Sequence, residues 1–198
     1  EMAQADGRAS TTIRISCRWL SVCAGYYRYD QGYRPHFESE ETFGGDIISP
    51  QSWPSDLDWT GKRVTVIGSG ATAVTLVPTL AKTAKHVTML QRTPSYVVSV
   101  PTEDSLLKRL ERIRAPAAAI SRIMFWKNVT SNIFAYELAR RFPEFTRRLI
   151  HKEIKRELGQ HVDVSEHFNP PYNPWDQRVC VVPDGDLFDA IRRGSADI

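Results

Sequence analysis

The stretch Arg63-Val64-Thr65-Val66-Ile67-Gly68-Ser69-Gly70-Ala71-Thr72-Ala73 decides the fold of this 198-residue chain. Its first five residues are rich in β-branched side chains and predict a buried strand. The glycines that follow have the spacing G-x-G-x-x-A. The Ala-, Leu- and Val-rich segment 71–84 predicts a helix, in which Pro78 either starts a new turn or causes a kink. A second strand is expected at 86–90. This order of strand, glycine turn, helix and strand predicts a parallel α/β unit.

The residue types in the turn fit a dinucleotide pyrophosphate. Gly68 permits a tight turn, Gly70 lets the backbone approach the phosphates, and the small Ala73 lets the helix pack closely on the strand. The N–H groups and the dipole at the start of the helix would then face the phosphates. We therefore expect the cofactor to bind along Gly68, Ser69, Gly70, Ala71, Thr72, Ala73 and Val74. The alternative is an ordinary strand–glycine–helix turn without a ligand.

The end of the second strand indicates which nucleotide would bind. An NAD site usually has Asp or Glu there to bond the ribose 2′-hydroxyl, whereas this sequence has Gln91, Arg92 and Thr93. A guanidinium at position 92 would pair with a 2′-phosphate, and the Thr93 hydroxyl could add a hydrogen bond. The sequence therefore favours NADP(H) over NAD(H), with a plain surface arginine at position 92 as the alternative.

The composition is that of an ordinary globular protein. Hydrophobic residues make up 41% and charged residues 25% of the chain, which argues against global disorder. No stretch approaches the ~18 uninterrupted apolar residues of a membrane-spanning helix. The N-terminal residues lack the layout of a signal peptide, and the three cysteines fit a reducing compartment. These features predict a cytoplasmic protein.

Other kinds of chemistry have little support in the sequence. The histidines lack metal-ligand spacing, no G-x-S-x-G nucleophile elbow occurs, and the basic segments lack the interleaved aromatic residues of a nucleic-acid platform. We therefore expect no metal and no nucleic-acid partner. Peripheral contact with a membrane has no specific support.

The net charge of +3 conceals a strongly basic segment. Between Lys108 and Arg156 there are 13 Lys or Arg and four Glu, a local charge of +9 that leaves −6 for the rest of the chain. Apolar residues recur there at spacings of three and four, which predicts amphipathic helices that begin or break near Pro116 and Pro143. We expect a helical insertion over 103–160. Its basic face is either solvated or in contact with an anionic cofactor, a partner domain or a membrane surface.

Two further strands are expected outside the insertion. One is Arg178-Val179-Cys180-Val181-Val182, followed by a short helix over 185–193 that Asp184 could cap. The other is Trp19–Cys23, which would lead into a turn at 24–27. Because strands alternate with helices, we predict an α/β fold: a Rossmann-like NADP-binding domain with a parallel sheet and a helical insertion.

Several ordered motifs resemble those of class B flavoprotein monooxygenases, the family of the Baeyer–Villiger monooxygenases. The segment Phe43–Pro54 is similar to their fingerprint F-x-G-x-x-x-H-x-x-x-W-P. The segment 23–30, the glycine turn, Tyr172–Cys180 and Pro183–Phe188 extend the resemblance to roughly residues 17–198. It implies an enzyme in which NADPH reduces FAD. The flavin then uses O₂ to insert oxygen beside a ketone or to oxidise a sulfur-containing substrate.

The resemblance also implies roles for single residues. Arg178 falls at the family's active-site arginine, which lies near the flavin, stabilises its oxygenated anion and helps to position NADP. The alternative for Arg178 is a salt-bridged strand residue. Trp53 would belong to a linker that couples cofactor binding to domain movement, or would be a packed core residue. Ser49 departs from the fingerprint histidine, and because serine lacks the charge and reach of imidazole, oxygenation could be less efficient.

The family's FAD-binding motif is missing from the sequence, since only Gly68 and Gly70 form a G-x-G. We therefore expect the NADP-binding part of a longer flavoenzyme, which would not turn over alone. The alternatives are a non-catalytic NADP-binding module or remnant and a simple NADP reductase. The expected organisation is an unassigned tail (1–16), the end of an FAD-domain segment with the fingerprint linker (17–60), an NADP-binding βαβ core (61–102), the helical insertion (103–160) and a return to the NADP-binding domain (161–198).

Overall fold

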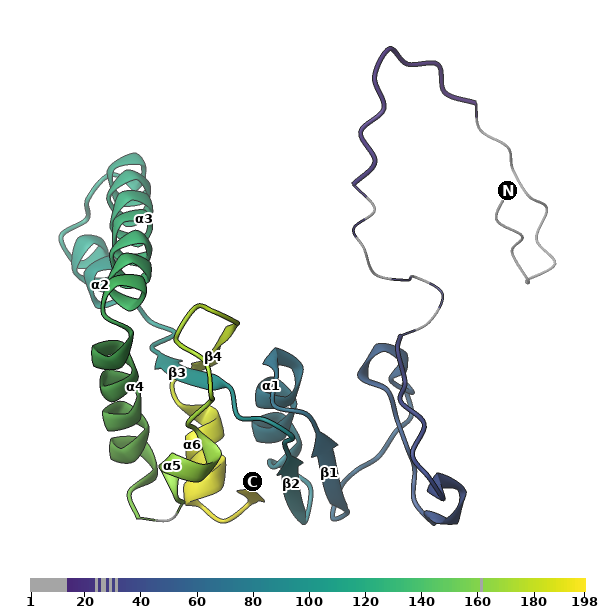
Figure 1. The fold of residues 1–198 in the computed structure, drawn as a ribbon. Helices are drawn as coiled ribbons and strands as arrows, with labels where there is room; N and C mark the ends of the chain where they lie inside the picture. Colours follow the sequence, from purple (N-terminus) through teal and green to yellow (C-terminus); the bar gives the residue numbers. More distant parts are fainter. Residues whose placement is uncertain (1–13, 24, 26–27, 29, 31, 161) are drawn as a thin grey trace. The chain divides into compact units, whose positions relative to one another are not determined.

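The computed structural model describes residues 14–23, 25, 28, 30, 32–160 and 162–198. The chain divides into two compact units, Glu1–Trp53 and Pro54–Ile198 (Figure 1). The described part of the first unit contains two short 3₁₀ helices, η1 (Glu40–Thr42) and η2 (Pro50–Ser52). The second unit contains the strand–helix–strand arrangement predicted around the glycine turn, together with the remaining helices and strands.

The strand expected at Trp19–Cys23 is not formed. The structure gives these residues no strand assignment, and the side chains of Trp19, Leu20 and Val22 are exposed. A strand is stable only when a neighbour accepts and donates its ladder hydrogen bonds, and no described segment does so here. The turn expected at 24–27 falls largely outside the described residues.

Parallel strands form the centre of the second unit. One sheet has the order β1 (Arg63–Ile67), β2 (His86–Leu90), β5 (Ala196–Asp197), and a second sheet pairs β3 (Tyr96–Val100) with β4 (Val179–Pro183) (Figure 1). The two strands expected beside the glycine turn are confirmed with the predicted bounds, and the third expected strand lies one residue later than predicted. The chain is thus a mixed α/β protein with parallel strands.

Helix α1 (Ala71–Leu80) covers one face of the first sheet. Its buried residues recur at helical spacing and share a core with the inward residues of β2: Ala73, Val74, Val77, Leu80, Val87 and Met89. The helix continues through Pro78 without a new start and ends at Leu80, earlier than the predicted residue 84, where a turn follows. Close packing of α1 on the strands fixes the glycine turn at its N-terminus.

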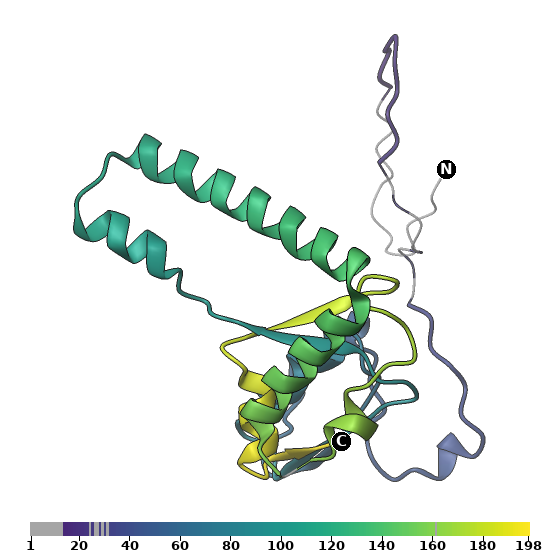
Figure 2. The same cartoon turned by 60° about the vertical axis from the view of Figure 1, so that its left-hand side comes forward.

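The basic segment forms three helices, α2 (Ser105–Arg112), α3 (Ala117–Arg141) and α4 (Pro143–Leu158). As the two prolines predict, Pro116 is the N-cap of α3 and Pro143 is the first residue of α4. Figure 2 shows α2 and α3 side by side, extending away from the strands, whereas α4 lies against them. Only Ala139 of α3 is buried.

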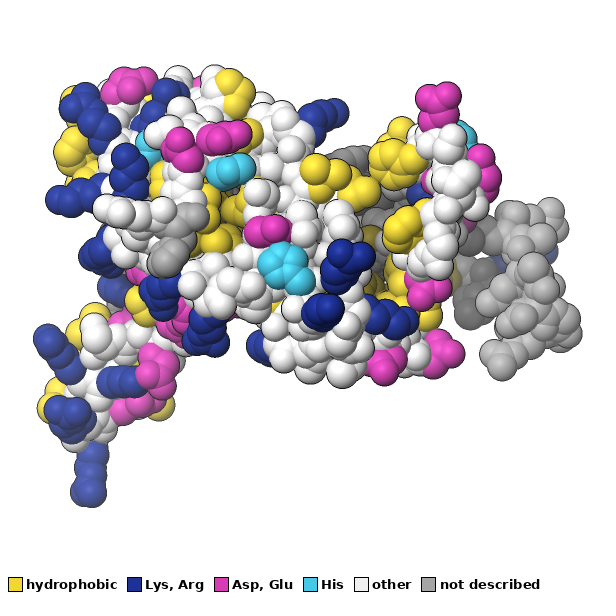
Figure 3. All heavy atoms as spheres, turned by 90° about the horizontal axis from the view of Figure 1, so that it is seen from below, with side chains coloured by type: hydrophobic (Ala, Val, Ile, Leu, Met, Phe, Trp, Pro, Cys, Tyr) yellow, Lys and Arg dark blue, Asp and Glu magenta, His cyan; other side chains and the backbone are white. Residues whose placement is uncertain are grey.

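The basic side chains of these helices face solvent with one exception. Figure 3 shows many Lys and Arg side chains over the left-hand part of the molecule, where Figure 1 places α2, α3 and α4. Every Lys or Arg between Lys108 and Arg156 is exposed except Arg147. The predicted basic face is therefore present, and Arg147 does not belong to it.

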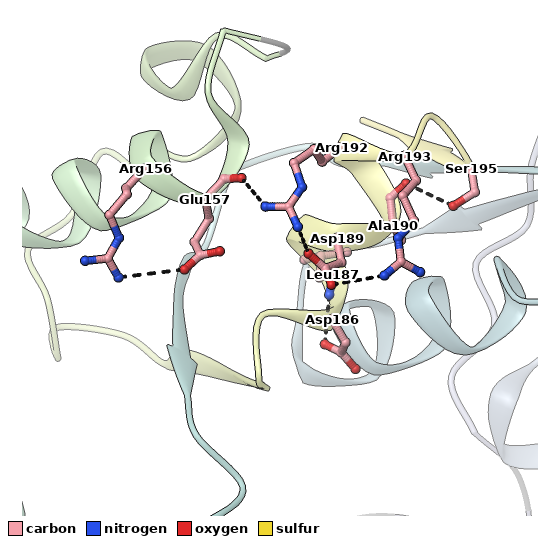
Figure 4. Close-up of polar contacts among 9 residues, drawn as sticks. All are labelled: Arg156, Glu157, Asp186, Leu187, Asp189, Ala190, Arg192, Arg193 and Ser195. Carbon is pink, nitrogen blue, oxygen red and sulfur yellow. Dashed lines mark hydrogen bonds and ion pairs between the residues drawn. The ribbon is translucent and has the colours of Figure 1, made fainter.

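Helix α6 (Asp186–Arg192) packs beside α4 and follows β4. The Arg192 guanidinium donates to the carbonyl oxygen of Glu157, the last residue but one of α4, at 3.1 Å (Figure 4). After α6, the Ser195 hydroxyl donates to the Ala190 carbonyl oxygen at 2.9 Å (Figure 4). These contacts fix the chain as it enters β5. A short helix, α5 (Val164–His167), lies between α4 and β4.

The capping role predicted for Asp184 is wrong. The N-cap of α6 is Gly185, whose φ of +70° favours glycine, and no side chain caps the helix. The Asp184 carboxylate instead accepts the backbone N–H of Thr102 at 3.0 Å and also the Thr102 hydroxyl. These bonds lower the pKa of Asp184. Asp184, which follows β4, is therefore hydrogen-bonded to Thr102, which follows β3, and this contact holds the ends of the two strands together.

Candidate nucleotide-binding site

The glycine turn joins β1 to α1 in the way that a phosphate site requires. The Gly68 N–H donates to the carbonyl oxygen of Leu90 at 2.8 Å, and its φ of +136° lies where only glycine is comfortable. Gly70 is the N-cap of α1, has extended backbone and offers no capping side chain. The first N–H groups of α1 therefore remain available to an anion, and the first turn carries no acidic residue that would repel one.

The predicted site residues in α1 divide into two sets. Ala71 and Thr72 are exposed at the start of the helix, whereas Ala73 and Val74 are buried in the core. The first pair stands in the first turn of the helix, where backbone N–H groups have no intrahelical acceptor, and neither N–H donates to another described backbone group. The second pair holds the helix against the strands, which is the role that the small residue of the motif predicts.

Ser69 ties the turn to the loop that follows β2. Its hydroxyl donates to the carbonyl oxygen of Thr93 at 2.7 Å and lies 3.4 Å from the Ser95 hydroxyl. Thr93 thus contacts the glycine turn through its backbone carbonyl oxygen and not through its hydroxyl. Arg92, next to Thr93, is exposed and makes no hydrogen bond or ion pair with any residue that the structure describes. The turn and the loop carrying Arg92 are therefore joined, with the guanidinium left free for a ligand.

Arg178 lies beside the same turn, although 108 positions separate it from Gly70 in the sequence. A Cβ on Gly70 would stand 3.2 Å from the Arg178 Nη1 atom. Arg178 is exposed, precedes β4 and forms no ion pair within the described part of the chain, so it is not a salt-bridged strand residue there. A helix N-terminus and a free guanidinium thus meet at Gly70, an arrangement suited to a phosphate or another anion.

The cysteine near this site does not suit nucleophilic or redox chemistry. Cys180 is buried, which raises the pKa of its thiol, while the charge of Arg178 opposes the shift. A protonated, buried thiol is a weak nucleophile. No described group of three His, Cys, Asp or Glu residues could hold a metal ion.

Four residues for which the sequence analysis gave no individual role contact one another at the start of the segment that leads to Arg178: Tyr96, Arg147, Tyr172 and Asn173. The Arg147 guanidinium donates to the Tyr96 hydroxyl and the Asn173 side-chain oxygen, at 3.1 Å each. One signal could have identified Arg147. It stands three and seven residues before Ile150 and Ile154 on α4, which places it on the inward stripe of that helix.

The fingerprint segment of the first unit shows a local reason for its glycine. A Cβ on Gly45 would fall 2.8 Å from the ring of Phe43, so the aromatic ring occupies the space that any side chain would need. Ser49 is the N-cap of η2 but its hydroxyl makes no capping bond. Trp53 is the last residue of this unit.

A sequence model of a known family matches most of the chain. The family is described as FMO-like, flavin-binding monooxygenase-like, and the match spans residues 4–155. The chain belongs to this family. Within the described ranges, no helix combines the length and apolar character needed to cross a membrane.

The chain is also similar in sequence to named monooxygenases. The chain is 49% identical over 189 residues to the FAD-containing monooxygenase EthA of Mycobacterium tuberculosis (strain ATCC 25618 / H37Rv), covering 95% of this chain and 38% of that protein. It is 47% identical over 184 residues to the probable FAD-binding monooxygenase AlmA of an Acinetobacter species, covering 92% of this chain and 37% of the relative. The chain therefore spans less than two fifths of the length of these relatives.

Solved structures show the same fold. A steroid monooxygenase bound to NADP matches with a TM-score of 0.58 and 22% identity, over 82% of this chain and 37% of that one. A cyclohexanone monooxygenase from Rhodococcus sp. Phi1 bound to NADP⁺ matches with a TM-score of 0.57 and 17% identity, over 84% and 38%. At this identity the likeness concerns the arrangement of the strands and helices.

Proposed function

We propose that this chain supplies the NADP(H)-binding, Rossmann-like domain of an FAD-dependent Baeyer–Villiger-type monooxygenase. The domain would comprise the βαβ core at 61–102, the helical insertion at 103–160 and the return segment at 161–198, with the fingerprint linker preceding them. The observation that carries the proposal is the meeting of Arg178 with Gly70 at the uncapped start of α1. The substrate would be a ketone or a sulfur-containing small molecule.

The residues present fit the pyrophosphate of NADP(H). Gly68 and Gly70 leave two positions of the turn without a side chain, and Ala71 and Thr72 stand at the helix N-terminus, where N–H groups can bind phosphate. Arg178 adds a permanent positive charge on the side of Gly70. Both the close approach and the positive field that a diphosphate needs are therefore present.

The loop after β2 fits the 2′-phosphate that distinguishes NADP(H) from NAD(H). Ser69 fixes this loop through the Thr93 carbonyl oxygen, and Arg92 has no competing partner among the described residues. A free guanidinium forms charge-assisted, bidentate hydrogen bonds with a phosphate. Arg92 would therefore select NADP(H), and Ser69 would hold the loop in place for it.

The bound cofactors would supply a hydride from NADPH and, through reduced FAD and O₂, an oxygen atom for the substrate. The chain's own contribution is to bind and orient the nicotinamide nucleotide and to place positive charge beside it. Arg178 would stabilise negative charge next to the glycine turn, because a guanidinium presents a planar fork of N–H donors that suits an anion. Ala73 and Val74, by packing α1 on the strands, keep the N–H groups aimed at the phosphates.

A second candidate function is a non-catalytic NADP-binding module. Two observations favour it: every residue of the glycine-turn site lies in the unit Pro54–Ile198, and Ser49 stands at the fingerprint histidine. The two candidates share the nucleotide site and differ in flavin binding and turnover.

Titration of the purified 198-residue chain with NADP⁺ and NAD⁺ tests the shared site. We expect NADP⁺ to bind at least about tenfold more tightly, the effect of one charge-assisted phosphate contact. Gly70→Val should abolish binding because its side chain enters the space next to Arg178. Gly44→Val is the matched control, since no atom lies within 4 Å of the Cβ position of Gly44. Equal affinity for both nucleotides, or none, would contradict the proposal.

The visible spectrum and NADPH oxidation separate the two candidates. Bound flavin together with NADPH oxidation dependent on a ketone or thioether would exclude the non-catalytic module. NADP⁺ binding without flavin or turnover in this chain would support the module for the chain as tested. A change in NADP⁺ affinity on addition of FAD would show that the chain also meets the flavin, which favours the monooxygenase.

A further inference from the structure

Arg147 reaches from the helical segment to the loop that leads to Arg178. Its Nε donates to the Tyr96 hydroxyl oxygen at 3.1 Å, and its Nη2 donates to the Asn173 Oδ1 at 3.1 Å and to the Tyr172 carbonyl oxygen at 3.4 Å. The side chain is only 26% exposed. A planar guanidinium can make these three bonds together because its donors are fixed as a fork.

Tyr96 holds both ends of the same loop. Its ring is fully buried and packs edge-on against Tyr172 with the ring centroids 5.6 Å apart, and its hydroxyl donates to the Tyr172 carbonyl oxygen at 2.7 Å. Its backbone is paired with Val179, the first residue of β4. Burial raises the pKa of the Tyr96 hydroxyl, so it stays protonated and able to donate.

The loop between these anchors is held in a conformation that it would not adopt alone. Trp175 has a φ of +68°, which is unfavourable for a residue with a side chain and persists only where the surroundings enforce it. The Asn173 N–H donates to the Asp176 carboxylate at 3.3 Å, and the Asp176 N–H donates back to the Asn173 carbonyl oxygen at 3.0 Å. An ion pair with Arg140 of α3 also fixes Asp176.

Arg178 stands between two fixed points of this loop. Asp176, two residues earlier, is held by the contacts to α3, and Val179, one residue later, is held by β3. The backbone of Arg178 therefore has little freedom, and its guanidinium lies beside Gly70. The contacts that hold Asp176 and Val179 are made with α3, with Asn173 and with β3, and none of them involves the glycine turn.

We propose that Arg147 is a positioning residue that, with Tyr96, clamps the segment Tyr172–Arg178 so that Arg178 faces the glycine turn. The helical insertion would thereby set the affinity of the site for NADP(H). This inference rests on the proposed nucleotide site. It gives the insertion a role in nucleotide binding besides that of a solvated basic face.

The test compares Arg147→Met with Arg148→Met in the full chain. Arg148 is the neighbouring residue on α4, is exposed and has no hydrogen bond or ion pair to any described residue. We expect Arg147→Met to weaken NADP⁺ binding about tenfold and Arg148→Met to weaken it less than about twofold. Tyr96→Phe, which removes only the hydroxyl, should weaken binding in the same direction as Arg147→Met.

Two further readouts separate positioning from general loss of structure. In an Arg178→Ala background, Arg147→Met should add less than about a twofold loss, because the two residues act through one contact. Hydrogen exchange of the peptide spanning Tyr172–Arg178 should accelerate in Arg147→Met and in Tyr96→Phe, but not in Arg148→Met. Exchange in β1 and β2 should stay unchanged in all variants.

The results that overturn the inference are equally specific. Equal NADP⁺ affinity in Arg147→Met and Arg148→Met would refute it, as would the same tenfold loss in the presence and absence of the Arg178 side chain. If even the unmodified chain binds no NADP⁺, the proposed function fails. In that case, accelerated exchange of the Tyr172–Arg178 peptide in both Arg147→Met and Tyr96→Phe, measured without nucleotide, would still establish the clamp, and unchanged exchange in Arg147→Met would refute it.

Discussion

Arg92 is the residue on which the choice of nucleotide depends. The end of β2 carries no carboxylate to bond a ribose 2′-hydroxyl, and the Arg92 guanidinium has no partner in the described part of the chain. We expect Arg92→Ala to weaken NADP⁺ binding about tenfold or more and to leave NAD⁺ binding unchanged, because only NADP⁺ carries the 2′-phosphate. Calorimetric titration with both nucleotides measures the two affinities. An unchanged NADP⁺ affinity would show that Arg92 does not contact the 2′-phosphate.

Single residues differ in how far the sequence could predict their place. Gly68 and Gly70 were predictable because the motif states a backbone requirement, and the structure shows it as a positive φ at Gly68 and a close approach at Gly70. The approach of Arg178 to Gly70 could not be read from spacing, since it depends on the course of the chain between them. The capping role of Asp184 was mispredicted because its carboxylate accepts from Thr102, which lies 82 positions earlier in the chain and whose proximity local sequence does not indicate.

At the scale of elements, local pattern predicted β1, β2 and the helix α1, and placed β4 one residue early, but β3 was not predicted although its sequence is rich in valine. β1 and β2 coincide with the short apolar and β-branched segments predicted as strands, and the prolines mark the starts of α3 and α4. The expected strand at Trp19–Cys23 failed because pairing is a property of two segments, and one sequence run cannot specify its neighbour. For the same reason, nothing in the sequence indicated that β3 and β4 pair apart from the first sheet.

The connection from β4 to α6 offers a test at this scale. Gly185 has a φ of +70°, and a Cβ on it would lie 3.3 Å from the Ser99 hydroxyl oxygen. We expect Gly185→Ala to lower the free energy of unfolding by about 2 kcal/mol, from the left-handed backbone and the close contact together. Gly61→Ala is the matched comparison, since Gly61 has a φ of +68° and no atom within 4 Å of its Cβ position.

Urea denaturation of the two glycine variants measures this difference. Gly61→Ala should cost about 1 kcal/mol, the backbone penalty alone. A Gly185→Ala variant no less stable than Gly61→Ala would mean that the connection adjusts around Ser99 without cost. In that case the left-handed backbone at Gly185, and not the close contact with Ser99, would be the reason that this position favours glycine.

At the scale of the whole molecule, one core joins the two sheets of the second unit. Residues from α1, β2, β3, β4, α4 and α6 contribute to it: Val77, Val87, Val97, Val182, Leu158 and Leu187. The helix that places Arg147 near the loop of Arg178 is thus packed on the same core that fixes the glycine turn. A change that loosens the packing of α4 should therefore lower the stability of this unit and also disturb the geometry of the nucleotide site.

His151 lies on α4 and offers a way to change this packing through pH. Its Nε2 is buried without a hydrogen-bond partner among the described residues. Burial lowers the pKa of His151, a hydrogen bond with the Phe168 backbone opposes the shift, and the charges of Arg147 and Lys155 reinforce it. The folded state therefore prefers the neutral imidazole, whereas the unfolded chain takes up a proton near pH 6.5.

Because the unfolded state binds more protons below about pH 6.5, the free energy of unfolding should fall as the pH is lowered through that value. One histidine contributes at most about 1.4 kcal/mol per pH unit, and its contribution ends once the pH is below the folded-state pKa. We expect His151→Gln, which cannot gain a charge, to lose stability less steeply between pH 7 and 5 than the unmodified chain. Urea denaturation at several pH values measures both slopes, and His86→Gln serves as the comparison for a histidine that has an acidic partner, since the His86 Nε2 lies 3.2 Å from the Asp197 carboxylate. Parallel curves for His151→Gln and the unmodified chain would show that the imidazole accepts its proton in place, which requires α4 to open water access to Nε2 while the core beneath it stays packed.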